Sequence, residues 1–441
     1  MTSARALRRA TARQQALEQA VREGLLGPAA PVVGLLDVDG ILDSVADLKA
    51  AFAGAPVQHT FAVKACALAP VLRLLAREGL GCEVASAGEL ALALAAGFDP
   101  GQLVFDSPAK TVDELAHALE SGVAVNADSF QELERIDALL GRREPVGPIG
   151  LRVNPQVGAG RVAATSTATE TSKFGVTLRD RGAVEAVTEA FARLPWLTRL
   201  HAHIGSLGCP PSLLAAGIAA AHELAEHINA VLGRRQVTGL DIGGGLPVGF
   251  TDDEDDPGFA DYAAELRSSV PGLFDGRYTL VTEFGRALFA KNGTIASVVE
   301  YTKSAGGRRI AITHAGAQVA ARAMAMPEAW PLRVLAFDAQ GRPKSGPTAV
   351  HDIAGPCCFS GDLTAVGRSL PVLEPGDLVA LCDTGAYSFS AHFAYNSLPR
   401  PAVHGYRTAP GGGVRLAPVR SAQTIAQVVA DSGTDHLDSL L

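Results

Sequence analysis

A lysine stands at the end of a short apolar run in the stretch "QHTFAVKACALAPVLRLLAREG", residues 58–79. Lys64 follows β-branched and aromatic residues that are typical of a buried strand, and helical spacing of apolar residues begins directly after it. An amine that loses part of its hydration in an apolar pocket has a lowered pKa and becomes a nucleophile. A lysine that snorkels out of a strand end is the plainer alternative.

Other strand ends favour the nucleophile. "HAHIGS", "DIGGGLP" and "TEFGR" each follow a run of strand-forming residues. The residues of interest in them are His203, Ser206, Gly243, Gly244, Gly245, Glu283, Gly285 and Arg286. Three successive glycines expose backbone N–H groups that suit an anionic phosphate, although most glycine-rich turns are only turns. An amine, a phosphate cradle, a flat ring at His203 and an acid at Glu283 together describe a site for pyridoxal phosphate, in which the acid keeps the pyridine nitrogen protonated.

The elements that must position these groups alternate along the chain. Strand candidates separated by helix-length patterns lie at 60–65, 81–86, 102–106, 123–128, 149–154, 198–205, 239–245 and 278–286. Capping-box patterns start three of the helices, at Ser86, Thr111 and Ser129. Strand, cap and helix repeated eight times predicts a (β/α)₈ barrel, and the count of eight favours it over a doubly wound open sheet.

Beyond about residue 290 the helical periodicity fades. Short valine-rich strands, Gly-Pro turns and "LEPGDLVAL" (373–381) predict an antiparallel β domain. An extra strand at 32–38 can join that sheet, because the first barrel strand already has its own candidate. The predicted organisation is an N-terminal helix and strand over 1–40, a cofactor-binding barrel over 41–290 and a C-terminal β domain over 291–441.

Composition excludes several classes of protein. The 441 residues carry a net charge of −8, which argues against nucleic-acid binding, and no apolar run of membrane-spanning length occurs. The Arg-rich start predicts an amphipathic helix, with a transit peptide as the alternative. Six cysteines without a paired framework or export signal predict reduced thiols and a cytoplasmic protein.

Taken together, these motifs resemble the fold-type III pyridoxal-phosphate decarboxylases, which act on diaminopimelate, ornithine and arginine. The resemblance covers residues 32–402 and implies an alanine-racemase-like α/β barrel with a C-terminal β domain. "FAVKA" resembles the family's cofactor-lysine strand and implies that Lys64 binds the cofactor covalently. "HIGS" implies that His203 stacks on the ring and that Ser206 lies near the phosphate.

"GGG" resembles the family's phosphate loop, and "EFGR" its E-P-G-R motif with phenylalanine in place of proline. The second match implies that Glu283 faces the pyridine nitrogen and that Arg286 faces phosphate or substrate. "RVNP" (152–155) and "SKFG" (172–175) are similar to the diaminopimelate branch.

The C-terminal part carries further matches. "GPCCFSGD" (355–362) resembles a loop that reaches across a dimer interface in the family, which implies a homodimer with shared active sites. By this resemblance Cys358 is the candidate proton donor and Asp362 a substrate contact, while an inert buried thiol is the alternative for Cys358 and packing is the prediction for Cys357. "GAYSFS" implies that Tyr387 contacts the phosphate and substrate, and "YNSLPRPA" resembles the family's closing motif.

Three departures from the family pattern concern the substrate. Phe359 replaces a glutamate that the family uses for a distal ammonium, and an unpaired ammonium there would cost several kcal/mol. Arg322 survives in "HAGAQVAARAM" and, with Arg286, suits a distal carboxylate, a structural ion pair being the alternative. Glu83 replaces an aspartate and is predicted either to order the ring stack near His203 or to form a rim salt bridge.

The resulting prediction is a pyridoxal-phosphate-dependent decarboxylase of a small amino-acid substrate with distal carboxylates. The chain looks similar to the siderophore branch that decarboxylates citryl-diamino acids, and diaminopimelate decarboxylation is the alternative. An amino-acid racemase, a non-enzymatic cofactor-binding protein and a metal-dependent barrel hydrolase are the rival classes. The C-terminal domain argues against the second, and no metal pattern beyond "HAH" (201–203) supports the third.

Overall fold

The computed structural model describes residues 2–160 and 166–441. The chain divides into two compact units, which we call the sheet unit and the barrel unit. The sheet unit comprises Met1–Asp43, Gly249–Glu254 and Phe289–Leu441, and the barrel unit comprises Ser44–Val248 and Asp255–Leu288. No sequence pattern indicated that the short segment Gly249–Glu254 belongs with the sheet unit.

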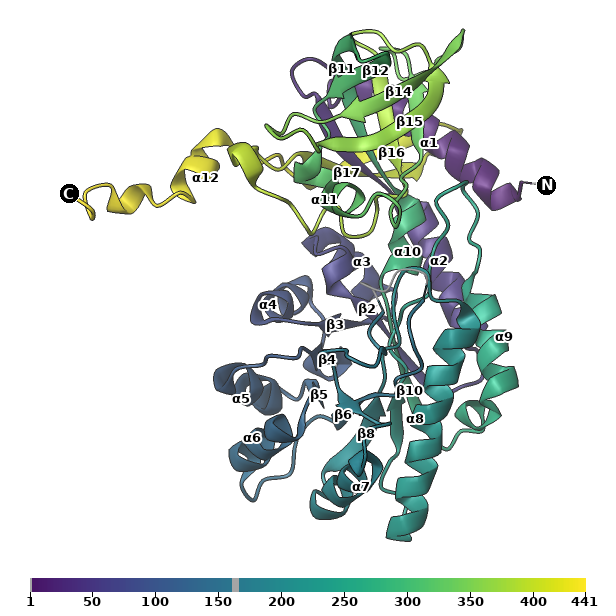
Figure 1. Cartoon of the computed structure of the whole chain (residues 1–441), viewed down its shortest axis with the longest axis vertical. Helices are drawn as coiled ribbons and strands as arrows, with labels where there is room; N and C mark the ends of the chain where they lie inside the picture. Colours follow the sequence, from purple (N-terminus) through teal and green to yellow (C-terminus); the bar gives the residue numbers. More distant parts are fainter. Residues whose placement is uncertain (1, 161–165) are drawn as a thin grey trace. The chain divides into compact units, whose positions relative to one another are not determined.

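Eight parallel strands close a barrel within the described residues of the barrel unit (Figure 1). They are β2 (Val57–Ala62), β3 (Gly81–Val84), β4 (Leu103–Asp106), β5 (Ala124–Ala127), β6 (Ile149–Asn154), β8 (Leu197–His201), β9 (Gly239–Asp241) and β10 (Thr279–Phe284). β10 pairs with β2, and β5 pairs with β6, so the ring has no open edge. This closure confirms the barrel and excludes an open sheet. A short strand, β7 (Val176–Thr177), adds to β6.

Every residue of the short strands β3, β4, β5 and β9 is buried. Burial of both faces is usual for parallel strands and explains why these segments read as continuous apolar runs rather than as alternating patterns. A charged side chain on such a strand is therefore buried as well, which matters for the carboxylates described below.

Helices follow the strands, and α3 to α6 lie outside the barrel strands in Figure 1. The helices are α2 (Val38–Ala51), α3 (Ala69–Arg77), α4 (Ala87–Ala96), α5 (Val112–Ser121), α6 (Phe130–Leu140), α7 (Ala183–Arg193), α8 (Pro211–Leu232), α9 (Phe259–Ser269) and α10 (Arg286–Phe289). Short 3₁₀ turns are η1 (Val63–Ala65), η2 (Pro100–Gln102), η4 (Pro271–Phe274) and η5 (Ala290–Asn292).

The three predicted helix caps are present. The hydroxyl groups of Ser86, Thr111 and Ser129 each accept the backbone N–H three residues later. Only at Thr111 does the glutamate three residues on bond back to the cap residue itself. Each cap satisfies an N–H group that the helix would otherwise leave unpaired, so these local signals position the helices.

The sheet unit contains a nine-stranded sheet in its described residues. Its strands are β1 (Val32–Asp37), β11 (Gly293–Ala305), β12 (Arg308–Thr313), β13 (Val334–Phe337), β14 (Thr348–Ala354), β15 (Leu363–Pro371), β16 (Leu378–Cys382), β17 (Ala402–Thr408) and β18 (Val414–Arg420). β1 pairs antiparallel with β11 and parallel with β17. The sheet is mostly antiparallel, as predicted, but β12 and β14 also form a parallel pair.

The N-terminal helix α1 (Ala4–Arg22) packs on this sheet through one face. Ala12, Ala16, Leu17 and Ala20 are buried in a core cluster that includes Val33 of β1. Small residues at helical spacing let α1 approach the sheet closely. The unit also contains α11 (Ala317–Ala325), α12 (Ile425–Ala430), η6 (Tyr395–Ser397) and η7 (Thr434–His436).

In the described part of the chain, no helix is both long and apolar enough to cross a membrane. All six cysteines lie in that part, and each is a free thiol.

Candidate functional site

Chemistry-bearing side chains of the barrel unit come from the carboxyl ends of its strands. Lys64 lies in the single turn η1 directly after β2. Glu83 lies on β3, His201 is the last residue of β8, and Glu283 is next to last on β10. Because the strands are parallel, these carboxyl ends gather at one rim, which is where barrels of this kind carry their active sites.

Lys64 forms an ion pair with the carboxylate of Glu83. Its Nζ atom lies 2.7 Å from Oε1 and 2.6 Å from Oε2. The lysine side chain is 40% exposed, whereas that of Glu83 is fully buried. Burial raises the pKa of Glu83 to about 8; Lys64 opposes the rise, and the charges of Glu283 and Asp106 add to it. The salt bridge predicted as the alternative for Glu83 is therefore present, and the role of Glu83 in ordering the ring stack stays a prediction.

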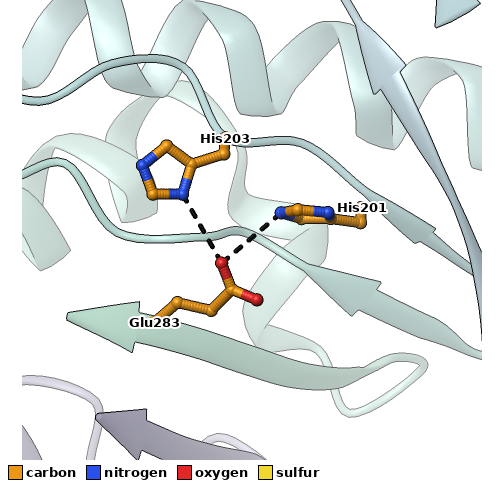
Figure 2. Close-up of side chains that lie close together, drawn as sticks. All are labelled: His201, His203 and Glu283. Carbon is orange, nitrogen blue, oxygen red and sulfur yellow. Dashed lines mark hydrogen bonds and ion pairs between the residues drawn. The ribbon is translucent and has the colours of Figure 1, made fainter. Parts of the chain in front are cut away.

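Glu283 lies between two histidines, as Figure 2 shows. Its Oε2 atom is 3.5 Å from Nε2 of His201 and 3.5 Å from Nδ1 of His203. Burial opposes ionisation of Glu283, but the charges and hydrogen bonds of the two histidines hold its pKa well below the usual value. Glu283 is therefore an ionised acid at neutral pH.

His201 connects Glu283 to a second buried carboxylate. Its Nδ1 atom lies 3.5 Å from Oδ1 of Asp106, the last residue of β4. Burial lowers the pKa of the imidazole, but Asp106 and Glu283 outweigh burial and raise it to about 9. His201 is thus a buried cation between two carboxylates. Sequence reasoning assigned no role to His201 or Asp106, although both end a strand at the rim.

Ligand atoms of His201, His203 and Glu283 lie within 4.8 Å of one another, a spacing that a metal ion would also accept. The geometry of these three residues alone thus leaves both a metal and an organic cofactor open. The neighbouring lysine and glycines, and the relatives described below, decide between them.

Asp241 is a further buried acid that sequence reasoning missed. It ends β9, accepts Nδ2 of Asn126 at 2.9 Å and accepts the N–H of Gly243 at 3.1 Å. Burial, followed by the charge of Glu283, raises the pKa of Asp241 to about 7. The contact with Gly243 fixes the first residue of the glycine turn to the end of the strand.

The glycine turn admits no side chain. Gly243 and Gly245 have φ angles of +62° and +97°. A Cβ atom on Gly244 would lie 2.3 Å from the backbone oxygen of Glu283, and one on Gly245 would lie 2.2 Å from that of Gly205. Glycine is therefore required at all three positions: at Gly243 and Gly245 for the positive φ angles, and at Gly244 for the close approach to Glu283 of β10.

Ser206 and Arg286 meet although 80 residues separate them. Nη2 of Arg286 donates to Oγ of Ser206 at 3.0 Å. Arg286 is the first residue of α10 and is buried. The preceding Gly285 leaves room for Ala65, because a Cβ atom there would lie 2.8 Å from that of Ala65. A guanidinium and a hydroxyl group held together in this way can bind an oxyanion.

In the sheet unit, Asp362 fixes the loop that joins β14 to β15. Its Oδ1 atom accepts the N–H of Ala317 at 2.7 Å, and Oδ2 accepts the N–H of Cys357 at 2.6 Å. Asp362 is buried, and both oxygens bind backbone. These contacts give Asp362 a structural role in holding the loop against the start of α11, and its contact with substrate stays a prediction.

The two adjacent cysteines differ in exposure. Cys357 is buried, and burial raises the pKa of its thiol, which agrees with the packing role predicted for it. Cys358 is exposed, and its N–H donates to Oδ1 of Asn396 at 2.8 Å. The alternative of a buried thiol at Cys358 is therefore wrong.

Phe359 belongs to an exposed aromatic cluster. Its ring meets Tyr395 edge-on with centroids 5.4 Å apart, and Tyr395 stacks on Phe393 at 5.6 Å. Phe359 is 37% exposed. The residue at this position therefore presents an apolar ring, with no charge for an ammonium group.

Arg322 stacks on aromatic rings. Its guanidinium carbon lies 4.0 Å from the ring centre of Tyr387 and 5.6 Å from that of Trp330. Within the described residues, Arg322 has no carboxylate partner, so the structural ion pair is not what is found. Tyr387 adopts a left-handed backbone conformation, with φ +68°. Nearby in sequence, His314 instead pairs with Glu300 at 3.0 Å.

The sequence profile of a family described as "Pyridoxal-dependent decarboxylase, pyridoxal binding domain" matches residues 38–290. The diaminopimelate decarboxylase of Pseudomonas aeruginosa is 36% identical over 355 residues, which are 80% of this chain and 82% of that protein. That of Methanothermobacter thermautotrophicus is 34% identical over 83% of this chain and 85% of that protein.

Solved structures of diaminopimelate decarboxylases also resemble this chain. The diaminopimelate decarboxylase of Helicobacter pylori, complexed with L-lysine, matches with a TM-score of 0.78 and 26% identity, covering 91% of this chain and 97% of that one. The enzyme of M. jannaschii, also with L-lysine, matches with a TM-score of 0.81 and 26% identity over 95% and 94%. These relatives favour the diaminopimelate prediction over the citryl-diamino-acid one, and a decarboxylase over a racemase or hydrolase.

Proposed function

Because the chain belongs to the pyridoxal-dependent decarboxylases, we propose that it removes the α-carboxylate of an amino acid bearing a distal carboxylate, with meso-diaminopimelate as the first candidate. The chain is a carboxy-lyase that uses pyridoxal phosphate. The diaminopimelate decarboxylases it resembles match over about four-fifths of both chains, which supports this choice of substrate. The observation that carries the proposal is the rim of the barrel unit, where Lys64, His203 and Glu283 lie together.

Residues of the barrel unit fit the cofactor. Oε1 of Glu283 is buried and has no hydrogen-bond partner among the described residues, so it can accept a hydrogen bond from the protonated ring nitrogen of the cofactor. Cβ atoms on Gly244 and Gly245 would clash with the backbone of Glu283 and Gly205, so no side chain of this turn can obstruct a phosphate that approaches its backbone. Lys64 is partly exposed and can reach an aldehyde.

When bound, pyridoxal phosphate supplies an electron sink for the electron pair released as the α-carboxylate leaves as CO₂. Lys64 would bind the cofactor covalently, and Glu283, kept ionised by its histidines, would hold a proton at the ring nitrogen. His203 would stack on the ring. Arg286, Ser206 and the glycine turn would hold the phosphate. Tyr387 would add a phosphate or substrate contact.

A proton must return to the carbon that lost CO₂. Cys358 is the proposed donor, because it is exposed and a thiol can act as a general acid. By the family resemblance this loop serves the active site of a neighbouring copy, so the proposal includes a homodimer. Mixing Lys64→Ala subunits with Cys358→Ala subunits should restore part of the activity that each variant lacks alone. Verified mixed dimers without activity would reject the shared site.

The second candidate substrate is a citryl-diamino acid, whose citryl end carries carboxylates and no distal ammonium. Phe359 favours this candidate, because an aromatic ring cannot pair with an ammonium as a carboxylate does. Arg322 is compatible with either candidate, since its guanidinium has no carboxylate partner in the described residues and can bind a substrate carboxylate.

Release of CO₂ from a panel of substrates tests the proposal. The panel should hold meso-diaminopimelate, lysine, ornithine, arginine and a citryl-diamino acid, with Lys64→Ala as the inactive control. Turnover of diaminopimelate supports the first candidate and rejects the interpretation of Phe359. Turnover of the citryl compound alone supports the second. Activity restricted to lysine, ornithine or arginine would reject the distal carboxylate.

One substitution compares the two candidates directly. Phe359→Glu adds a carboxylate for an ammonium, and Phe359→Leu is the matched control that stays apolar. If the wild type prefers the citryl compound, Phe359→Glu should shift kcat/KM toward diaminopimelate by about tenfold or more, because a charged hydrogen bond contributes about 1.5–3 kcal/mol. An equal shift in both variants would show that ring removal, not charge, is responsible.

A further inference from the structure

We propose that Glu83 is a catalytic residue: its carboxylate takes the proton from Nζ of Lys64 when the lysine binds the cofactor aldehyde and returns that proton when the lysine is released. The proposal rests on the proposed function, in which Lys64 binds the cofactor. It is independent of which amino acid the enzyme decarboxylates.

Geometry supports a direct transfer. Both oxygens of Glu83 lie within 2.7 Å of Nζ, so a proton can pass between lysine and carboxylate without an intervening group. Glu83 comes from β3 and Lys64 from the turn after β2, and these strands are hydrogen-bonded neighbours. The barrel backbone therefore fixes the pair, and Glu83 cannot turn toward water because its side chain is fully buried.

The surroundings allow Glu83 to hold a proton near neutral pH. The charged groups that act on it are Lys64, Glu283 on β10 and Asp106 on β4. Burial, with the two carboxylates, raises the pKa of Glu83 to about 8, against the attraction of Lys64. A group with a pKa near the working pH is the best proton carrier, because it both accepts and donates readily.

The bonds and protons balance. The Lys64 ammonium first gives a proton to the Glu83 carboxylate, which leaves a neutral amine and a carboxylic acid. The amine nitrogen would then form a bond to the aldehyde carbon of pyridoxal phosphate, and the aldehyde oxygen would leave as water with the two protons of the amine. Glu83 returns its proton to the nitrogen of the new C=N bond. Release of Lys64 by the substrate amine runs the same transfers in reverse order.

The length of the Glu83 side chain sets its contact distances with Lys64. The family pattern has aspartate at this position, and replacing Glu83 by aspartate would withdraw the carboxylate by about 1.5 Å, one C–C bond. Contacts of 2.6 and 2.7 Å would then exceed hydrogen-bond length unless the backbone moved.

Cofactor uptake by the apoprotein tests the proposal without any amino-acid substrate. Apoprotein is mixed with pyridoxal phosphate, the bond is trapped with borohydride at set times, and labelling of Lys64 is measured by mass spectrometry. Glu83→Gln should slow labelling by about 10²-fold or more and make its rate depend on buffer concentration, because the buffer must then take the proton. Glu83→Asp should be intermediate.

A buried pair elsewhere in the barrel unit provides the matched control. Nζ of Lys110 lies 2.9 Å from Oε1 of Glu132, and both side chains are buried. Glu132→Gln removes a comparable ion pair and should leave labelling of Lys64 unchanged. Circular dichroism and urea unfolding of each variant report whether it folds, so that slow labelling is not a sign of misfolding.

Chemical rescue distinguishes proton transfer from simple positioning. Glu83→Ala leaves space beside Lys64, and added formate should restore its labelling rate in proportion to formate concentration. Two results would overturn the proposal: labelling of Lys64 at the wild-type rate in folded Glu83→Gln, or no effect of formate on the labelling rate of folded Glu83→Ala. Failure of the substrate panel would leave this result unaffected, because the two experiments share no substrate.

Discussion

Replacing the buried His201 with glutamine should change how the stability of the barrel unit depends on pH. His201 is fully buried and lies 3.5 Å from a carboxylate oxygen of Asp106 and of Glu283. Raising the pKa of a histidine from 6.5 to about 9 corresponds to about 3 kcal/mol in favour of the protonated, folded form. Glutamine keeps a polar side chain at this site and removes the charge.

The direction follows from proton binding. Because the folded-state pKa of His201 is above its unfolded value of 6.5, its contribution is fully present below about pH 6.5 and is lost as pH rises through about 9. We therefore compare the free energy of unfolding of the wild type with that of His201→Gln. The wild type's advantage should be about 3 kcal/mol larger at about pH 6 than at about pH 9.5. Glu83 and Asp241, whose pKa values are raised to about 8 and 7, also stabilise the folded state more at low pH than at high pH, but both residues remain in the variant.

Urea unfolding of the apoprotein measures this difference. The chain has two tryptophans, of which Trp196 lies in the barrel unit and Trp330 in the sheet unit. Trp330→Phe therefore gives a background in which fluorescence reports the barrel unit alone. His227→Gln, on an exposed position of α8, is the matched control. If His201→Gln and this control follow wild type in parallel across the pH range, the buried cation is refuted.

Three further changes test other parts of the structure. Asp253→Asn should destabilise the sheet unit by about 3–5 kcal/mol in urea, followed by Trp330 fluorescence in a Trp196→Phe background, because Asp253 binds two guanidinium groups at 2.6–2.9 Å. Gly244→Ala should weaken pyridoxal-phosphate binding about tenfold in a fluorescence titration, because its Cβ atom would meet backbone at 2.3 Å. Thr111→Ala should cost about 1 kcal/mol of barrel stability in urea, followed by Trp196 fluorescence in the Trp330→Phe background, and no loss would show that the α5 cap contributes nothing.

Local pattern was enough to place the elements and the lysine. Each of the eight strands overlaps its predicted segment, and Ser86, Thr111 and Ser129 cap helices as predicted. Capping and hydrophobic periodicity act within a few residues, so a single sequence can be read for them. Lys64 could be placed at the end of β2 for the same reason.

The substrate prediction relied on a different kind of signal. Phe359 and Arg322 suggested a substrate unlike diaminopimelate, yet the relatives from Pseudomonas aeruginosa and Methanothermobacter thermautotrophicus are diaminopimelate decarboxylases. A single side chain shows which contacts are missing at one point. It does not reveal whether another group in the assembled site replaces them, so the panel of substrates has to decide.

The sequence by itself determined the order of strands and helices, the glycine turn and the position of Lys64, because these depend on neighbours along the chain. Only the tertiary structure decided the partners: Glu83 beside Lys64, 19 residues away, and His201 between Asp106 and Glu283. It also brought β1 to β11, with Val32 opposite Ser297. Such contacts depend on how strands pair and where the barrel closes, and no local pattern encodes which buried charges then face each other.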